Sequence, residues 1–216
     1  MVRVVQIGLR ARHLLVTNSE RIFASALCAI VALPWLPAAA SGSQVRELTD
    51  TPNDPGGDPG LEGTLHYTAR PGELNRLRVD KAPDGDGLLF TDRGVDAINI
   101  ATDSCERVTA QQVRCVPRDT TYYMRISMGD GPDRSLFISG GGLGTRLFGG
   151  DGADVLRSRA KGTSIYGGKG NDLIRATAPS GPSHPVDCGP GRDRATRTKG
   201  RRTYNCERIE QIPAGR

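Results

Sequence analysis

Two stretches of the chain place glycines and an aspartate at the same spacing. Phe148–Arg157 and Tyr166–Arg175 align without gaps as aromatic, Gly, Gly, any residue, Gly, any residue, Asp, two apolar residues and Arg. Glycine permits a tight turn whose carbonyls converge, because it tolerates positive φ and close backbone approach. Carbonyl and carboxylate oxygens are the ligands of a hard cation such as Ca²⁺, which takes about six to eight of them. The spacing predicts calcium binding centred on Asp154 and Asp172.

The alternative is a pair of Gly-Asp turns that bind no metal. Aspartate is common in turns because its side chain hydrogen-bonds the nearby backbone. A single Gly-x-Gly-x-Asp would not separate the two interpretations. Two complete copies, offset by eighteen residues, favour calcium, since self-similarity at a fixed period indicates stacked structural units.

The repeated residues resemble the glycine-rich nonapeptide of the RTX, or haemolysin-type, calcium-binding repeats. The resemblance implies a right-handed parallel β-roll, a form of β-solenoid, in which each unit makes a turn and a short strand. Calcium would lie between turns stacked on one side, so that Gly149–Asp154 lies beside Gly167–Asp172. The resemblance implies side-chain ligands from Asp154 and Asp172, and backbone carbonyl ligands from Gly149, Asp151, Gly168 and Gly170.

Weaker copies of the turn flank this pair, at Met128–Asp133 and Cys188–Asp193. The four aspartates, at positions 133, 154, 172 and 193, are separated by 21, 18 and 21 residues. If bulges or corner insertions absorb the three extra residues, all four turns lie on one side and form up to three sites. Pro132 and Pro190 alter the outer turns, so metal-bound and metal-free interpretations both stay open for Asp133 and Asp193.

The turns expected on the opposite side keep the period of nine but lack aspartate. Gly140–Thr145 and Ser158–Thr163 have Thr where Asp would stand. The sequence therefore predicts one side that bears calcium and one side without metal, which departs from the full family pattern.

The rest of the chain is expected to be all-β. Short runs of β-branched and aromatic residues alternate with Gly, Pro and Asp, and no stretch shows a helical stripe after residue 40. Ser41–Gly63, rich in Pro, Gly and Asp, is expected to be a disordered linker. Residues 64–127 form a strand-rich lead-in, and 128–216 hold the repeats and a C-terminal cap. The expected strands are Thr64–Ala69, Arg76–Val79, Leu88–Thr91, Val95–Ile100, Gln112–Val116 and Tyr122–Ser127.

Residues 1–40 have the pattern of a secretory signal peptide. Four arginines precede an apolar run from Ile22 to Leu36, and Ala38 and Ala40 occupy the positions that a signal peptidase requires. The run is shorter than the roughly 20 residues of a membrane span, although an N-terminal anchor helix is the alternative. Cleavage leaves 25 basic and 23 acidic residues, so the net charge falls from +5 to +2. We therefore expect a secreted, extracellular protein with no membrane span after cleavage and no nucleic-acid partner.

Four cysteines remain after the signal, and an even number in an exported chain predicts disulfides. They permit three connectivities, and we expect the local one, Cys105 with Cys115 and Cys188 with Cys206. A four-cysteine zinc site is the alternative, but no C-x-x-C is present. The segment Val186–Ile209 also resembles the closing unit of secreted actinobacterial repeat proteins, which implies a disulfide-capped C-terminus.

No catalytic motif is evident. The chain has no G-x-S-x-G and no H-E-x-x-H, and only His66 and His184 follow the signal. The sequence therefore predicts a non-enzymatic calcium-binding protein. An extracellular hydrolase with its catalytic part in Thr64–Ser127, and a surface-interaction protein, are the alternatives. The sequence specifies neither a further partner nor an oligomeric state.

Overall fold

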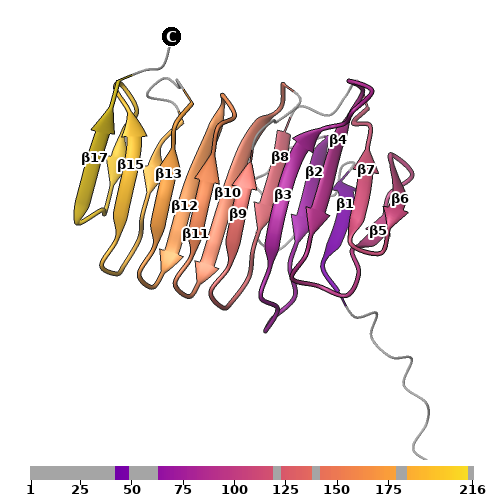
Figure 1. The fold of residues 1–216 in the computed structure, drawn as a ribbon, viewed down its shortest axis with the longest axis horizontal. Coiled ribbons are helices and arrows are strands. Elements are labelled where there is room, and N and C mark those ends of the chain that lie inside the picture. Colours follow the sequence, from indigo (N-terminus) through magenta and orange to yellow (C-terminus); the bar gives the residue numbers. More distant parts are fainter. Residues whose placement is uncertain (1–41, 49–62, 119–122, 138–141, 179–183, 214–216) are drawn as a thin grey trace, which may run out of the picture. The chain divides into compact units, whose positions relative to one another are not determined.

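The computed structural model describes residues 42–48, 63–118, 123–137, 142–178 and 184–213. All regular structure in this part of the chain is β-strand, arranged in two mixed, largely parallel sheets (Figure 1). The predicted signal peptide lies outside the described residues. No helix in the described part is long and apolar enough to cross a membrane.

The first sheet has eight strands. In spatial order they are β16 (Thr203–Tyr204), β14 (Val186–Asp187), β12 (Thr163–Lys169), β10 (Gly144–Asp151), β8 (Tyr123–Ser127), β2 (Thr64–Thr68), β1 (Gln44–Leu48) and β5 (Asn99–Ala101).

The second sheet has nine strands. In spatial order they are β17 (Arg208–Ile212), β15 (Arg194–Thr198), β13 (Leu173–Ala176), β11 (Val155–Ser158), β9 (Arg134–Phe137), β3 (Arg76–Lys81), β4 (Leu88–Asp92), β7 (Gln112–Cys115) and β6 (Cys105–Thr109).

From β8 to β17 the chain alternates between the two sheets. Each strand pairs in parallel with the strand two places earlier, so β10 pairs β8, and β11 pairs β9. The earlier strands differ, because β1–β2, β3–β4, β4–β7 and β6–β7 are antiparallel pairs. All pairs within the Gly-Asp repeats are therefore parallel, whereas every antiparallel pair lies in the earlier part of the described chain, which also contains the parallel pairs β1–β5, β2–β8 and β3–β9.

The hydrophobic core lies between the sheets and is built in rows. In the first sheet Leu147 pairs with Ile165, and Ile165 with Val186. In the second sheet Leu156 pairs with Ile174. All five side chains are fully buried. Because side chains alternate between the faces of a strand, one aliphatic residue from each strand adds to the same row.

The expected strands are largely confirmed, except that only the last two residues of Val95–Ile100 lie in a strand, β5. Two further differences stand out. β6 was not expected, and β1 lies inside the segment Ser41–Gly63 that was expected to be disordered. Gln44–Leu48 pairs with both β2 and β5, and Val45 is fully buried. The linker prediction is therefore wrong for these five residues, because burial of Val45 between two neighbours offsets the Pro- and Gly-rich composition around it.

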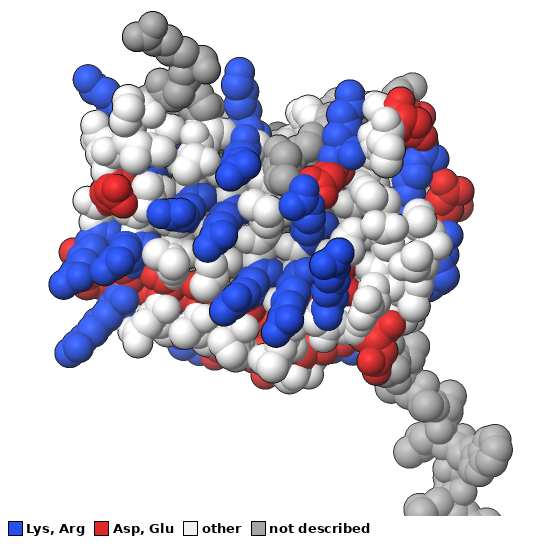
Figure 2. Space-filling model, in the orientation of Figure 1, with Lys and Arg blue, Asp and Glu red and all other residues white. Residues whose placement is uncertain are grey.

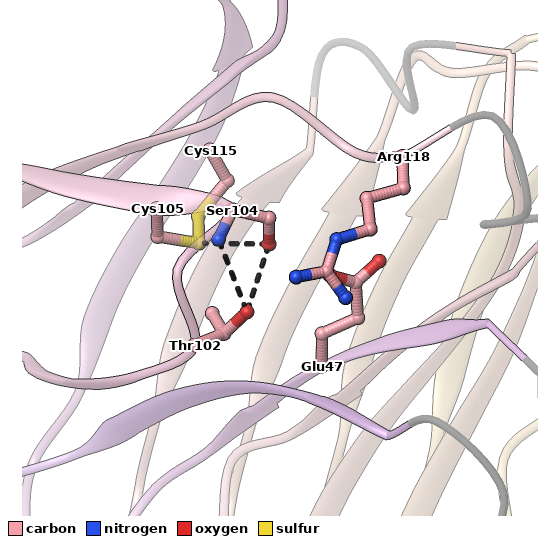
Figure 3. Close-up of a disulfide and its surroundings, with 6 residues drawn as sticks. All are labelled: Glu47, Thr102, Ser104, Cys105, Cys115 and Arg118. Carbon is pink, nitrogen blue, oxygen red and sulfur yellow. Dashed lines mark hydrogen bonds and ion pairs between the residues drawn. A yellow bond between two sulfur atoms is a disulfide. The ribbon is translucent and has the colours of Figure 1, made fainter.

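Both predicted disulfides are present. Cys105 bonds to Cys115, directly opposite it in the antiparallel β6–β7 pair (Figure 3). Cys188, after β14, bonds to Cys206, before β17. Each closes a short loop, of 10 and 18 residues in sequence separation, and the second ties the last strand of each sheet to the preceding repeats.

Candidate metal site: a row of buried aspartates

The four predicted aspartates stand at equivalent places in the second sheet. Asp133, Asp154, Asp172 and Asp193 each immediately precede a strand, namely β9, β11, β13 and β15. These strands pair in parallel with their first residues aligned, Arg134 with Val155, Val155 with Leu173 and Leu173 with Arg194. The aspartates therefore form one row across the N-terminal ends of these neighbouring strands, which we call the aspartate row.

A chain of hydrogen bonds links the row. The backbone N–H of Asp133 donates to Oδ1 of Asp154 over 2.8 Å, that of Asp154 to Oδ1 of Asp172 over 2.9 Å, and that of Asp172 to Oδ1 of Asp193 over 2.7 Å. Each carboxylate thus accepts from the backbone of the neighbouring repeat. One oxygen of each aspartate is used to hold the repeats in register.

Two further residues extend the row. The N–H of Asn75 donates to Oδ1 of Asp133 over 2.8 Å, and the N–H of Asp193 donates to Oε2 of Glu207 over 2.6 Å. Asn75 precedes β3 and Glu207 precedes β17, so both occupy the same place as the aspartates. Sequence reasoning missed them. The available signal was an acid or amide directly followed by Arg, as in Asp133-Arg134 and Asp193-Arg194.

The spacings of 21 residues are accommodated at the other end of the strands. Phe137 pairs with Ser158 and Thr145 with Thr163, so residues 138–144 match the shorter connection 159–162. In the same way, the connection formed by residues 177–185 corresponds to the shorter one formed by residues 159–164, because Ala176 pairs with Ser158 and Val186 pairs with Ile165. The three extra residues thus fall between Phe137 and Thr145 and between Ala176 and Val186, in keeping with the corner-insertion hypothesis; residues 138–141 and 179–183 lie outside the described part of the chain.

The second oxygen of each aspartate has no hydrogen-bond partner among the residues that the structure describes. The four side chains are at most 2% exposed, and their Oδ2 atoms form no hydrogen bond with any described residue. A buried carboxylate oxygen without a donor or a cation carries a desolvation cost that native structures usually avoid. The four Oδ2 atoms are therefore the strongest indication of a ligand in the described chain.

Two glycines lie directly against these oxygens, with no room for a side chain. An ideal Cβ built on Gly149 would lie 2.3 Å from the carbonyl oxygen of Gly167 and 2.4 Å from Oδ2 of Asp154. The same construction on Gly167 meets Oδ2 of Asp172 and the carbonyl oxygen of Cys188, each at 2.3 Å. A carboxylate oxygen and a carbonyl oxygen from the next repeat thus converge over a residue without a side chain. The donor set fits a hard cation.

The electrostatics of the row disfavour charge in the absence of a cation. Burial raises the pKa of Asp133 to about 7 and that of Asp154 to about 6. Burial also raises the pKa of Asp172 and of Asp193. The backbone N–H that each carboxylate accepts opposes the rise, and the neighbouring carboxylate of the row adds to it.

The other predicted ligands lie near the row with different partners. The Asp151 carboxylate is exposed and pairs with Lys169 over 2.9 Å, and its carbonyl accepts from the N–H of Gly131. Gly168 and Gly170 have φ of 107° and 130°, which favour glycine. The carbonyls that face the Oδ2 atoms belong to Gly167 and Cys188, which the spacing did not single out, whereas the predicted carbonyl of Gly170 lies with Oδ1 of Asp193 over Gly191.

The opposite connection carries hydroxyl groups that bond to each other and to the backbone. The Ser158 hydroxyl donates to Oγ1 of Thr163 over 3.2 Å, and the Thr163 hydroxyl donates to the carbonyl of Ala160. Thr163 is fully buried. These polar groups are thus satisfied within the chain, unlike the Oδ2 atoms.

The described residues contain no group of three or more His, Cys, Asp or Glu side chains placed to hold one metal ion. Comparison of the chain with protein-family models, with curated proteins and with solved structures finds no match. The assignment of function therefore rests on the aspartate row and its surroundings.

Proposed function

We propose that this chain is a secreted calcium-binding protein and that Ca²⁺ binds along the aspartate row. The observation that carries the proposal is the set of four buried Oδ2 atoms without partners, two of which face a carbonyl oxygen over a glycine. A cation would satisfy these oxygens and offset the repulsion between neighbouring carboxylates.

The ligands would come mainly from the backbone. With no cluster of three acidic side chains among the described residues, each site would take one or two carboxylates of the row and several carbonyls. The residues that would hold calcium in the central sites are Asp154 and Asp172, with the carbonyls of Gly167 and Cys188. Asp133 and Asp193 would extend the row at either end.

The alternation of parallel strands between two sheets supports the finer fold proposal, a right-handed β-roll of the RTX type. In such a coil each repeat contacts only its neighbours, so stability depends on the interface between successive repeats. Calcium would add to that interface. The two disulfides are compatible with the extracellular location that the N-terminal segment predicts.

Calcium titration of the purified protein tests the proposal. At a concentration about 100 times the dissociation constant, a ligand that binds only the folded state stabilises it by about 2.7 kcal/mol, or roughly 5–10 °C in Tm for a chain of this size. We expect that rise with Ca²⁺, a smaller one with Mg²⁺, and its reversal by a chelator.

The variant Asp154→Asn separates calcium binding from folding. The amide Oδ1 still accepts the N–H of Asp133, and its NH₂ can donate to the carbonyl of Gly167. We therefore expect a calcium-free Tm at or above that of the unmodified protein, with most of the calcium response lost. Asp151→Asn is the matched control, because that carboxylate is exposed and its carbonyl is unchanged. An equal calcium response in both variants contradicts the proposal.

A further inference from the structure

The outward face of the second sheet carries arginines at matched positions in neighbouring strands. Arg76 pairs with Arg134, Arg157 with Arg175 and Arg194 with Arg208, and all six side chains are exposed. Figure 2 shows blue side chains spread over this face. We call these six residues, together with Arg78 and Arg93, the arginine face.

Most of these guanidinium groups lack an acidic partner. Arg78 pairs with Asp80, whereas none of the other seven forms an ion pair with a described residue. Parallel neighbours lie about 4.8 Å apart, so like charges directly opposite each other destabilise the sheet. Folding therefore gives no reason for the arrangement, and an anion supplied from outside would remove the repulsion.

Five of the eight arginines line a groove of about 710 Å³, namely Arg76, Arg78, Arg93, Arg134 and Arg157, and Asp80, the partner of Arg78, is its one acidic lining residue among the described residues. Its floor includes the half-buried aliphatic side chains of Leu89, Leu136, Val155 and Leu173, which come from four different strands. The groove runs across the strands, so its occupant would meet one strand after another. None of its lining residues is aromatic.

This chemistry favours one class of occupant. Guanidinium groups bind carboxylate and sulfate in a bidentate manner, which suits arginine and not lysine. Single-stranded nucleic acids are bound chiefly by stacking bases on aromatic side chains, and the groove offers none. An aliphatic floor instead contacts the C–H groups of sugar rings. The strand spacing of about 4.8 Å is close to the length of one sugar unit in an extended polysaccharide.

We propose that the arginine face binds a linear acidic polysaccharide, laid across the strands of the second sheet with its anionic groups on the arginines. The proposal goes beyond calcium binding and does not require it. Its assay measures polysaccharide affinity at a fixed calcium concentration, and again with a chelator, so its failure is distinct from a failure of the calcium titration.

The test uses fluorescently labelled heparin and polygalacturonate, with dextran as the neutral control and single-stranded DNA as the competing class. We expect binding to at least one acidic polysaccharide at about 0.15 M salt and none to dextran. Failure to bind either acidic polysaccharide overturns the proposal. Tighter binding to DNA than to both polysaccharides also overturns it, in favour of a nucleic-acid partner.

Variants locate the site. Arg134→Gln with Arg157→Gln removes two guanidinium groups from the groove lining, and we expect affinity to fall at least about tenfold. The matched control, Lys199→Gln with Arg202→Gln, removes two exposed charges that do not line the groove, and affinity is expected to stay within about twofold. Equal losses in the two double variants contradict a site on the arginine face.

A lysine double variant tests the same site if the double variant Arg134→Gln with Arg157→Gln is poorly folded. Arg134→Lys with Arg157→Lys preserves the charge but removes the planar fork, and we expect a loss intermediate between the unmodified protein and the glutamine pair. Full affinity in the lysine pair contradicts bidentate recognition. Thermal unfolding of each variant shows whether a loss of affinity reflects loss of fold.

Discussion

The backbone N–H of Asp154 donates a 2.9 Å hydrogen bond to Oδ1 of Asp172, a residue eighteen positions further along the chain. The same bond recurs along the row with every aspartate. One carboxylate oxygen therefore fixes the register of neighbouring repeats, and the other is left for a ligand. This division of roles leads to three predictions beyond the two proposals above.

Gly149→Ala should destabilise the protein and abolish calcium binding in the central site. The new methyl group would lie 2.3 Å from the Gly167 carbonyl oxygen and 2.4 Å from Oδ2 of Asp154, so these two oxygens, which are proposed calcium ligands, would have to move. Overpacking of this kind costs about 1–3 kcal/mol. Urea denaturation with and without calcium measures both effects.

Gly142→Ala is the comparison for that variant. Gly142 has φ of 90° and no atom of a described residue within 4 Å of an added Cβ, so the cost of Gly142→Ala is backbone strain of about 1–2 kcal/mol. We expect Gly142→Ala to keep the full calcium response. A full calcium response in Gly149→Ala as well would show that the two oxygens against Gly149 are not calcium ligands.

In calcium-free buffer, stability should decrease as the pH rises from about 4 to about 7. The folded state raises the pKa of Asp133 to about 7 and of Asp154 to about 6, whereas an unfolded aspartate titrates near about 3.9. Folding thus favours the protonated form, and this contribution is complete below the unfolded pKa and lost as the pH passes the folded one.

With calcium present, stability should no longer decrease as the pH rises towards 7, because calcium binds the deprotonated carboxylates. Chemical denaturation at several pH values, with and without calcium, measures the two curves. Calcium-free stability that is constant or increases from pH 4 to 7 would show that the row is charged without penalty. Asp154→Asn should reduce the slope, since one titrating carboxylate is gone.

Glu207→Ala should loosen the last repeat. Oε2 of Glu207 accepts the N–H of Asp193 over 2.6 Å and ends the row, so its loss leaves that donor unpaired at a cost of about 1 kcal/mol. Hydrogen exchange at the Asp193 amide should accelerate, while the Asp133 amide, three places earlier in the row, should be little affected. Glu207→Gln retains an acceptor and should stay close to the unmodified protein, and equal exchange rates in the two variants would refute the capping role.

Much of the local structure was predictable from the sequence. Alternating apolar residues located strands such as Thr64–Thr68 and Tyr123–Ser127 within one or two residues, because each short run has one face suited to burial. The glycine spacing identified the four aspartates as equivalent, and sequence distance alone favoured the local disulfide pairs that the structure contains.

Other features depend on neighbours that are distant in sequence. Asn75 lies 58 residues before Asp133, and only the parallel pairing of β3 with β9 brings them into one row. β1 is stabilised by β2 and β5, which its own composition does not reveal. The carbonyls facing the aspartates are also not evident from spacing, since every residue has a carbonyl and orientation decides which one converges.

The sequence by itself determined the all-β class, the repeated turns and the residue types able to bind a cation. These follow from side-chain chemistry and from a period that is visible over a few dozen residues. Only the tertiary structure decided that the aspartates share one hydrogen-bonded row with Asn75 and Glu207, that their Oδ2 atoms are buried without partners, and that arginines from separate strands line one groove. Strand register sets all three, and register is fixed by packing between residues far apart in the chain.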